Sequence, residues 1–207
     1  MATSENPVLV EVRRGGAVES RHRGAAIVLD RDGAVLARWG DAEAPVFPRS
    51  AIKPIQALAL VESGAAWRFG VSEAELALAC ASHNGEDAHV SAVHAWLARM
   101  GLDEGALECG AHAPYLGTAE AAMRASGKTP GRAHNNCSGK HAGMLATALA
   151  LGASPTGYSR PDHDVQRRVR DVLSEMCGVD HAHAAMGTDG CGIPTYAIPL
   201  SALARAM

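Results

Sequence analysis

The stretch AAIVLDRDGAVLARWG, residues 25–40, decides the class of fold that this sequence predicts. Two apolar runs meet across Asp32-Gly33, and an Asp-Gly turn between such runs is typical of an antiparallel β-hairpin. Upstream, residues 8–12 and 17–23 have the character of further short strands. The first 40 residues therefore predict antiparallel strands.

From Ser50 onward the apolar residues recur at helical spacing instead. Ser72 and Glu75 have the form of a capping box, and several of the later segments are followed by a glycine, as helix ends often are. Helices are expected at residues 52–59, 72–80, 90–100, 119–126, 139–151 and 162–177. Strands first and helices afterwards predict an α+β fold.

Composition limits the classes of protein to which the chain can belong. It has 207 residues, 47% hydrophobic and 20% charged, with a net charge of −3, which suits a single domain spanning residues 1–207. Scattered Lys and Arg argue against a nucleic-acid surface, and no apolar run reaches the roughly 18 to 20 residues of a membrane span. The N-terminal segment lacks the pattern of a signal peptide, so we expect a cytoplasmic protein.

Ser50 and Lys53 are three residues apart at an expected helix start, so both side chains should lie on one face. A lysine with a lowered pKa can act as the base for a serine nucleophile. Ser82-His83-Asn84 then has the S-x-N form that follows S-x-x-K in serine β-lactamases. A serine cap beside an exposed lysine, and a serine in an ordinary loop, are the alternative interpretations.

Cysteines and possible metal ligands gather in two Gly- and Asn-rich loops. The five cysteines are widely spaced, which argues against a disulfide framework. Cys137 is followed by Lys140 and His141, and Cys191 is preceded by Asp189, so two thiolates and a nitrogen could hold Zn²⁺. Spacing alone favours His141 over Lys140 as the nitrogen ligand, and inert buried thiols are the alternative. His181 and His183 form a further H-x-H pair, which is either a ligand pair on a strand or exposed polar residues.

Five segments together resemble the L-asparaginase II family of the Rhizobium type. They are PRSAIKPIQALALVESGA, CASHNGE, ECGAHAPY, HNNCSGKHAGMLA and GTDGCGIP, which run in order from Pro48 to Pro194. The resemblance implies a fold similar to serine β-lactamases and glutaminases, with an antiparallel sheet packed by helices, and a homodimer. It also implies hydrolysis of the small molecule L-asparagine to L-aspartate and ammonia.

Carried onto this sequence, the resemblance implies Ser50 and Lys53 as one Ser-Lys pair and Ser82 as the serine of a second. It implies zinc held by Cys137, Lys140 and Cys191, which reverses the preference for His141. Arg49 and Asp189 lie in the motif loops with the charges needed to bind the carboxylate and ammonium of a free amino acid. We therefore expect these two residues to bind the substrate.

Family members continue beyond the point where this sequence stops, inside an expected helix opened by Ser201. We therefore expect a chain truncated at its C-terminus, without the lysine partner of Ser82. The alternative function is an inactive remnant that binds zinc or a partner. A penicillin-recognising acylase is less favoured, because Lys128-Thr129-Pro130 is no substitute for a K-T-G strand.

Overall fold

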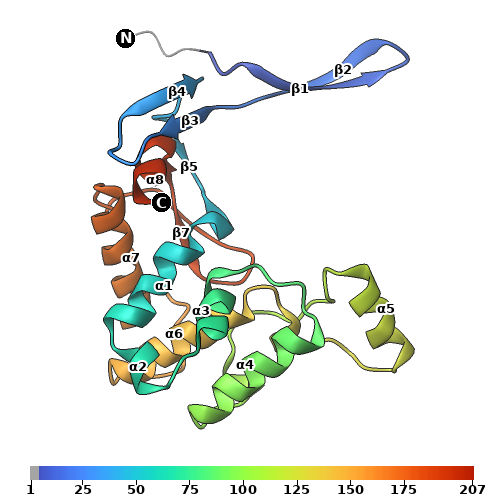
Figure 1. The fold of residues 1–207 in the computed structure, drawn as a ribbon, viewed down its shortest axis with the longest axis vertical. Coiled ribbons are helices and arrows are strands. Elements are labelled where there is room, and N and C mark those ends of the chain that lie inside the picture. Colours follow the sequence, from blue (N-terminus) through green and yellow to red (C-terminus); the bar gives the residue numbers. More distant parts are fainter. Residues whose placement is uncertain (1–4) are drawn as a thin grey trace.

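A computed structural model describes residues 5–207, and the expected α+β class is confirmed. Figure 1 shows a helical body with the strands β1 to β4 at one end of it. The N-terminal segment, which we expect to have no signal peptide, begins with residues 1–4, and these lie outside the described residues. The helices are α1 (Lys53–Glu62), α2 (Ala65–Arg68), α3 (Glu73–Cys80), α4 (Asp87–Arg99), α5 (Gly117–Ala125), α6 (Ser138–Ala150), α7 (Asp164–Cys177) and α8 (Leu200–Ala206).

The strands form antiparallel pairs. The pairs are β1 (Val8–Arg14) with β2 (Ala17–Arg23), β3 (Ala26–Leu29) with β4 (Val35–Trp39), β5 (Pro45–Val46) with β8 (Ile198–Pro199), and β6 (Met186–Thr188) with β7 (Pro194–Tyr196). The predicted hairpin at 25–40 is confirmed. Asp30 closes its turn, because its Oδ1 accepts from the backbone N–H groups of Asp32 and Ala34 at 2.9 and 2.8 Å.

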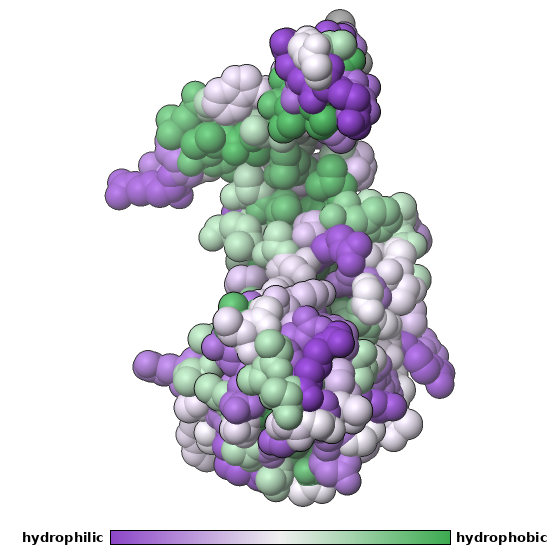
Figure 2. Space-filling view, turned by 90° about the vertical axis from the view of Figure 1, so that its right-hand side faces the viewer, coloured by the Kyte–Doolittle hydropathy of each residue, from purple (hydrophilic) through white to green (hydrophobic). Residues whose placement is uncertain are grey.

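The described strands differ from the single packed sheet that the family resemblance implies. They make four separate two-stranded ladders, and two of these ladders have strands of only two or three residues. The β3–β4 ladder packs against α8, while β1 and β2 are exposed along their whole length. In Figure 2 hydrophobic residues gather over the upper part of the molecule, where Val35, Leu36 and Trp39 of β4 are more than half exposed.

Local sequence signals explain where some of the helices begin or end. The Ser72–Glu75 capping box is present, and α7 ends at Gly178, which adopts the left-handed conformation with φ 63°. The spacing of apolar residues did not predict the short helix α2. The last helix begins at Leu200 rather than at a Ser201 cap, because the Ser201 hydroxyl donates to Glu43 Oε2 at 2.6 Å and is buried.

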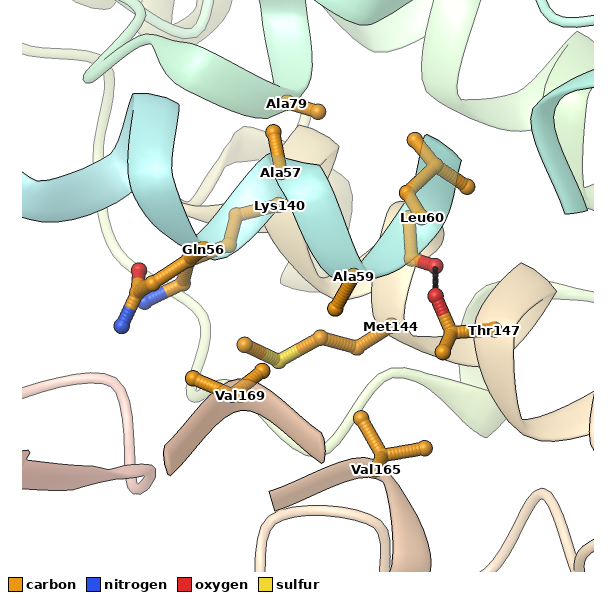
Figure 3. Close-up of a pocket in the computed structure, with 11 residues that line it drawn as sticks. Gln56, Ala57, Ala59, Leu60, Ala79, Lys140, Met144, Thr147, Val165 and Val169 are labelled. Carbon is orange, nitrogen blue, oxygen red and sulfur yellow. Dashed lines mark hydrogen bonds between the residues drawn. The ribbon is translucent and has the colours of Figure 1, made fainter. Parts of the chain in front are cut away.

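Helix α6 lies at the centre of the helical body, in contact with α1, α2, α3, α4 and α7. Eleven of its thirteen residues are buried, including the polar residues Ser138, Lys140, His141 and Thr147. Figure 3 shows the seam where α1, α6 and α7 meet, with Leu60, Met144 and Val169 around a cavity of about 10 Å³. No helix in residues 5–207 has the length and apolar character required to cross a bilayer.

Candidate active site

Four of the five motif segments meet at a surface depression of about 140 Å³. Residues far apart in the sequence line it, which agrees with a site assembled from loops that helix and strand ends hold in place. The lining residues are Arg49, Ser50, His112, Tyr115, Asn135, Asn136, Cys137, Asp189, Gly190 and Cys191. The predicted residues Ser50, Arg49, Asp189, Cys137 and Cys191 therefore lie around one pocket.

Arg49 has an unusual backbone conformation at the edge of this pocket. Its φ of 51° makes it the one non-glycine residue with positive φ in the described chain, and it is the first residue of the 3₁₀ turn Arg49–Ile52 that leads into α1. Such a conformation costs about 1 to 3 kcal/mol and tends to occur at functional sites. The residues after it lead directly into the helix: Ser50 lies in the 3₁₀ turn, and Lys53 is the first residue of α1.

Arg49 and Asp189, expected to bind opposite ends of a substrate, pair with each other. The distance from Arg49 Nη2 to Asp189 Oδ1 is 2.9 Å, and the Asp189 side chain is only 9% exposed. Asp189 Oδ1 also accepts from the backbone N–H of Gly190 at 2.8 Å. The pair joins the pocket wall formed by β6 and its turn to the wall formed by the start of α1.

Lys53 is buried, with 1% of its surface exposed, and its ammonium finds acceptors on the loop after α3. Its Nζ donates to Ala81 O at 2.7 Å and to Ser82 Oγ at 2.8 Å. Lys53 and Ser50 are joined only through the backbone, where the Lys53 N–H donates to Ser50 O. Within residues 5–207 no side-chain hydrogen bond joins them, so the Lys53 amine contacts the second predicted serine and not the first. Burial lowers the pKa of Lys53, although the neighbouring Cys137 opposes that shift.

The loop that carries Ser82 is held by His83. His83 Nδ1 accepts from the Gly85 N–H at 3.1 Å, so the Nε2 hydrogen is available to Ser138 Oγ, 2.8 Å away at the start of α6. The His83 N–H donates to Asn136 O. Burial, followed by the nearby His89, lowers the pKa of His83 to about 4. His83 is 4% exposed and joins the two motif loops through these hydrogen bonds.

Cys137, Lys140 and Cys191 come together in the interior wall of the pocket. Each is about 95% buried, and Lys140 Nζ lies 3.0 Å from Cys191 Sγ. A hydrogen bond from Cys137 to Cys191, then contacts with His141 and Lys140, hold the pKa of Cys191 far below its usual range. The same hydrogen bond and burial raise the pKa of Cys137. One sulfur of the pair is thus strongly favoured as a thiolate.

This cluster has the donor set for a metal ion only if the lysine takes part. Among the described residues no group of three His, Cys, Asp or Glu side chains could hold a metal ion. Two thiols and an amine nevertheless match the sulfur and nitrogen ligands that zinc prefers, with one tetrahedral position left for water or substrate. Cys137, Lys140 and Cys191 could therefore hold zinc.

The remaining histidines have different positions. His112 lines the pocket: its Nε2 accepts from the Asn136 N–H at 2.9 Å, and its ring lies 4.8 Å from that of the exposed Tyr115. His181 is buried beside Ser174, 3.2 Å from its hydroxyl, whereas His183 is exposed. Neither lies on a strand, so the interpretation of the H-x-H pair as strand ligands is wrong.

Sequence reasoning missed two groups behind the cluster. Tyr158 is fully buried in a loop without any recognisable motif, and its hydroxyl lies 2.7 Å from His141 Nδ1. Glu108, inside the motif ECGAH, accepts hydrogen bonds from the backbone N–H groups of Gly157 and Ser159 and so fixes that loop. Glu108 could have been found from its motif, but nothing in the sequence pointed to Tyr158.

Comparison with protein families gives a match over residues 10–207 to the model described as L-asparaginase II. A comparison with curated proteins gives no match.

Proposed function

This chain belongs to the L-asparaginase II family, and from that membership we propose that it hydrolyses the side-chain amide of L-asparagine to L-aspartate and ammonia. One observation carries the chemistry: the buried Lys53 donates to Ser82 Oγ at 2.8 Å, beside a pocket that Ser50 lines. A lysine whose pKa is lowered by burial is able to take a proton from a serine hydroxyl.

In the proposed reaction Ser50 Oγ attacks the side-chain amide carbon. Its proton passes to the Ser82 hydroxyl, which gives its own proton to Lys53 Nζ. Lys53 then returns a proton along the same path to the departing nitrogen, and ammonia leaves an aspartyl ester on Ser50. Water attacks that ester in a second step with Lys53 again acting as base, which releases aspartate and restores the serine.

A second assignment has Ser82 as the nucleophile. The direct contact between Lys53 and Ser82 favours it, because a base normally lies within hydrogen-bonding distance of the hydroxyl that it activates. Ser50 lines the pocket, whereas Ser82 is not among the lining residues. We therefore place Ser50 first and Ser82 second.

Substrate recognition is assigned to Arg49 and Asp189. Arg49 would bind the α-carboxylate and Asp189 the ammonium, and their ion pair keeps both groups oriented in the absence of substrate. A planar guanidinium can hold a carboxylate through two parallel hydrogen bonds, which a lysine cannot do. Arg49→Lys should therefore raise KM, and an unchanged KM would remove Arg49 from the site.

Cys137, Lys140 and Cys191 are proposed to hold Zn²⁺. When bound, the ion would supply positive charge beside the substrate pocket. Since thiols and an amine must lose protons to bind it, zinc should dissociate as the pH falls. The family resemblance also supports a serine β-lactamase-like architecture and a homodimer, and we keep both as proposals.

Ammonia release from asparagine by purified protein tests the function. Ser50→Ala should lower kcat by at least about 1,000-fold, and Ser82→Ala or Lys53→Met by about 100-fold or more. Rapid acid quenching followed by mass spectrometry of peptides should place the aspartyl ester on Ser50. An ester on Ser82 would establish the second assignment, and no ammonia release by the unmodified protein would reject the function.

A further inference from the structure

We propose that His83 is a positioning residue: by hydrogen-bonding the loop after α3 to the start of α6, it holds Ser82 Oγ against Lys53 Nζ. The inference rests on the proposed function, in which Lys53 acts on Ser82 whether Ser50 or Ser82 is the nucleophile. It gives a role in the alignment of the proton path to a histidine that does not line the pocket.

The loop at residues 81–86 has no regular secondary structure, so its side-chain contacts decide where Ser82 lies. Ser82 and Asn84 are exposed, whereas His83 and Gly85 are buried. This alternation is typical of extended chain, in which successive side chains point to opposite sides, and Ala81 has the extended values φ −97° and ψ 158°. His83 and Gly85 therefore anchor the loop, and Ser82 lies on its other side.

Both anchors lie against the segment at residues 131–138 that leads into α6. A Cβ atom at Gly85 would lie 2.9 Å from His134 O, so the two backbones are in close contact. The His83 N–H donates to Asn136 O at 3.2 Å, and His83 Nε2 lies 2.8 Å from Ser138 Oγ. The ring thus provides a side-chain hydrogen bond between the Ser82 loop and the first residue of α6.

The hydrogens around His83 have one consistent arrangement. Burial lowers its pKa to about 4, so the ring is neutral at neutral pH. Nδ1 accepts from the Gly85 N–H at 3.1 Å, which leaves the ring hydrogen on Nε2. The Ser138 hydroxyl donates to Ala133 O at 2.8 Å and accepts from Nε2. Neither ring nitrogen contacts Ser82, so His83 acts on this serine through its position and not as its base.

The position of this loop matters because the buried Lys53 amine has both of its acceptors there, Ala81 O and Ser82 Oγ. A displaced loop would separate both from the lysine at once. A misplacement of about 1 Å can lower a rate about 100-fold. Arg49 and Asp189, proposed to bind the substrate, lie on other segments, so loss of the anchor should lower kcat and leave KM unchanged.

The variants separate the bond to Ser138 from the turn inside the loop. His83→Asn can still accept from the Gly85 N–H but is too short to reach Ser138, whereas the longer amide of His83→Gln can donate to that hydroxyl. His181→Gln is the matched control, because His181 is also buried beside a serine hydroxyl, that of Ser174 in α7, at 3.2 Å.

The experiment measures kcat and KM for ammonia release from asparagine, together with hydrogen exchange of the backbone amide at position 83. We expect His83→Asn to lower kcat about 10- to 100-fold, with KM unchanged, and to speed exchange of that amide. His83→Gln should recover most of both losses, and His181→Gln should match the unmodified protein.

An unchanged kcat in His83→Asn, a loss confined to KM, or equal losses of kcat in His83→Asn and His83→Gln would each overturn the proposal. Ser138→Ala removes the same hydrogen bond from the other side and replaces His83→Asn if that variant does not fold. If the unmodified protein releases no ammonia, the proposed function fails, and hydrogen exchange still decides the anchor: equal rates in His83→Asn and the unmodified protein would overturn it.

Discussion

Helix α6 and the β1–β2 hairpin use polar residues in opposite ways. In α6, Ser138, Lys140 and His141 are all buried, and each has a specific partner on another part of the chain. In the hairpin every residue is exposed, and the charges pair with one another across the ladder, as Arg14 does with Glu19 at 2.8 Å. Figure 1 shows the hairpin projecting away from the helical body.

The difference shows where substitutions should lower the stability of this protein most. A buried polar group that loses its partner costs about 1 to 3 kcal/mol, whereas an exposed ion pair contributes little. The buried members of the proposed site, Lys53, Cys137, Lys140 and Cys191, therefore lie where replacement should cost most stability, whereas substitutions in the hairpin should cost little. Three predictions test this contrast.

The largest effect is expected from Gly139→Ala in α6. A Cβ atom there would lie 2.6 Å from Leu78 O and 2.7 Å from Leu78 Cγ, so the backbones of α3 and α6 must separate. We expect a loss of about 3 kcal/mol or more in unfolding free energy. The matched control is Gly143→Ala, whose Cβ would meet Leu60 Cδ2 at 3.4 Å and gain about 1 kcal/mol of helix propensity.

Urea unfolding followed by circular dichroism measures both variants. Equal stability of Gly139→Ala and Gly143→Ala would mean that α3 and α6 are not in close contact, and the contrast with the hairpin would lose its main support.

Acid should destabilise the region around α6 through His83. In the folded state the pKa of His83 is about 4, against an ordinary value of 6.5, so between these pH values the unfolded chain binds a proton that the folded chain excludes. Stability therefore falls as the pH drops below 6.5, by about 1.4 kcal/mol per pH unit and about 3 kcal/mol by pH 4. The lowered pKa values of His141 and His181 act in the same direction.

The test compares the pH dependence of unfolding free energy in the unmodified protein and in His83→Gln. The variant should be less stable at pH 7 and lose less on going from pH 7 to pH 5. Parallel curves would show that His83 does not titrate as its burial requires.

The smallest effect is expected in the hairpin, where Val10 is 54% exposed. Val10→Thr should change the unfolding free energy by less than about 0.5 kcal/mol. The same substitution at Val169, 2% exposed in the seam between α1, α6 and α7, should cost about 2 kcal/mol because it buries a hydroxyl among apolar groups. Thermal unfolding of the two variants side by side gives the comparison, and a larger loss at Val10 would reverse it.

The helices were predictable because their signals are local. The expected helix at 162–177 is α7, Asp164–Cys177, and the Ser72 cap and the glycine at 178 act where the sequence placed them. The ladders β5–β8 and β6–β7 were not predicted, because two- or three-residue strands carry too little periodicity. Their existence depends on pairing between segments far apart in the chain.

The sequence indicates which residues gather at the site, but it does not show which of their side chains contact each other. Ser50 and Lys53 share a helix start, yet the amine of Lys53 reaches Ala81 and Ser82, since a buried ammonium needs acceptors that its own helix does not offer. Arg49 and Asp189 have the expected opposite charges, but their mutual contact depends on how β6 and its turn lie against α1. Tyr158 became visible only through its distance to His141.

The ion pair between Arg49 and Asp189 also has a consequence for synthesis of the protein. A ribosome delivers the chain from the N-terminus, so α1, α3 and α6 can pack, with Lys53 already against Ser82, before Asp189 has left the exit tunnel. The wall formed by β6 and its turn, with Asp189 and Cys191, is added only afterwards. The helical interior of the nascent chain can thus fold before the pocket is complete.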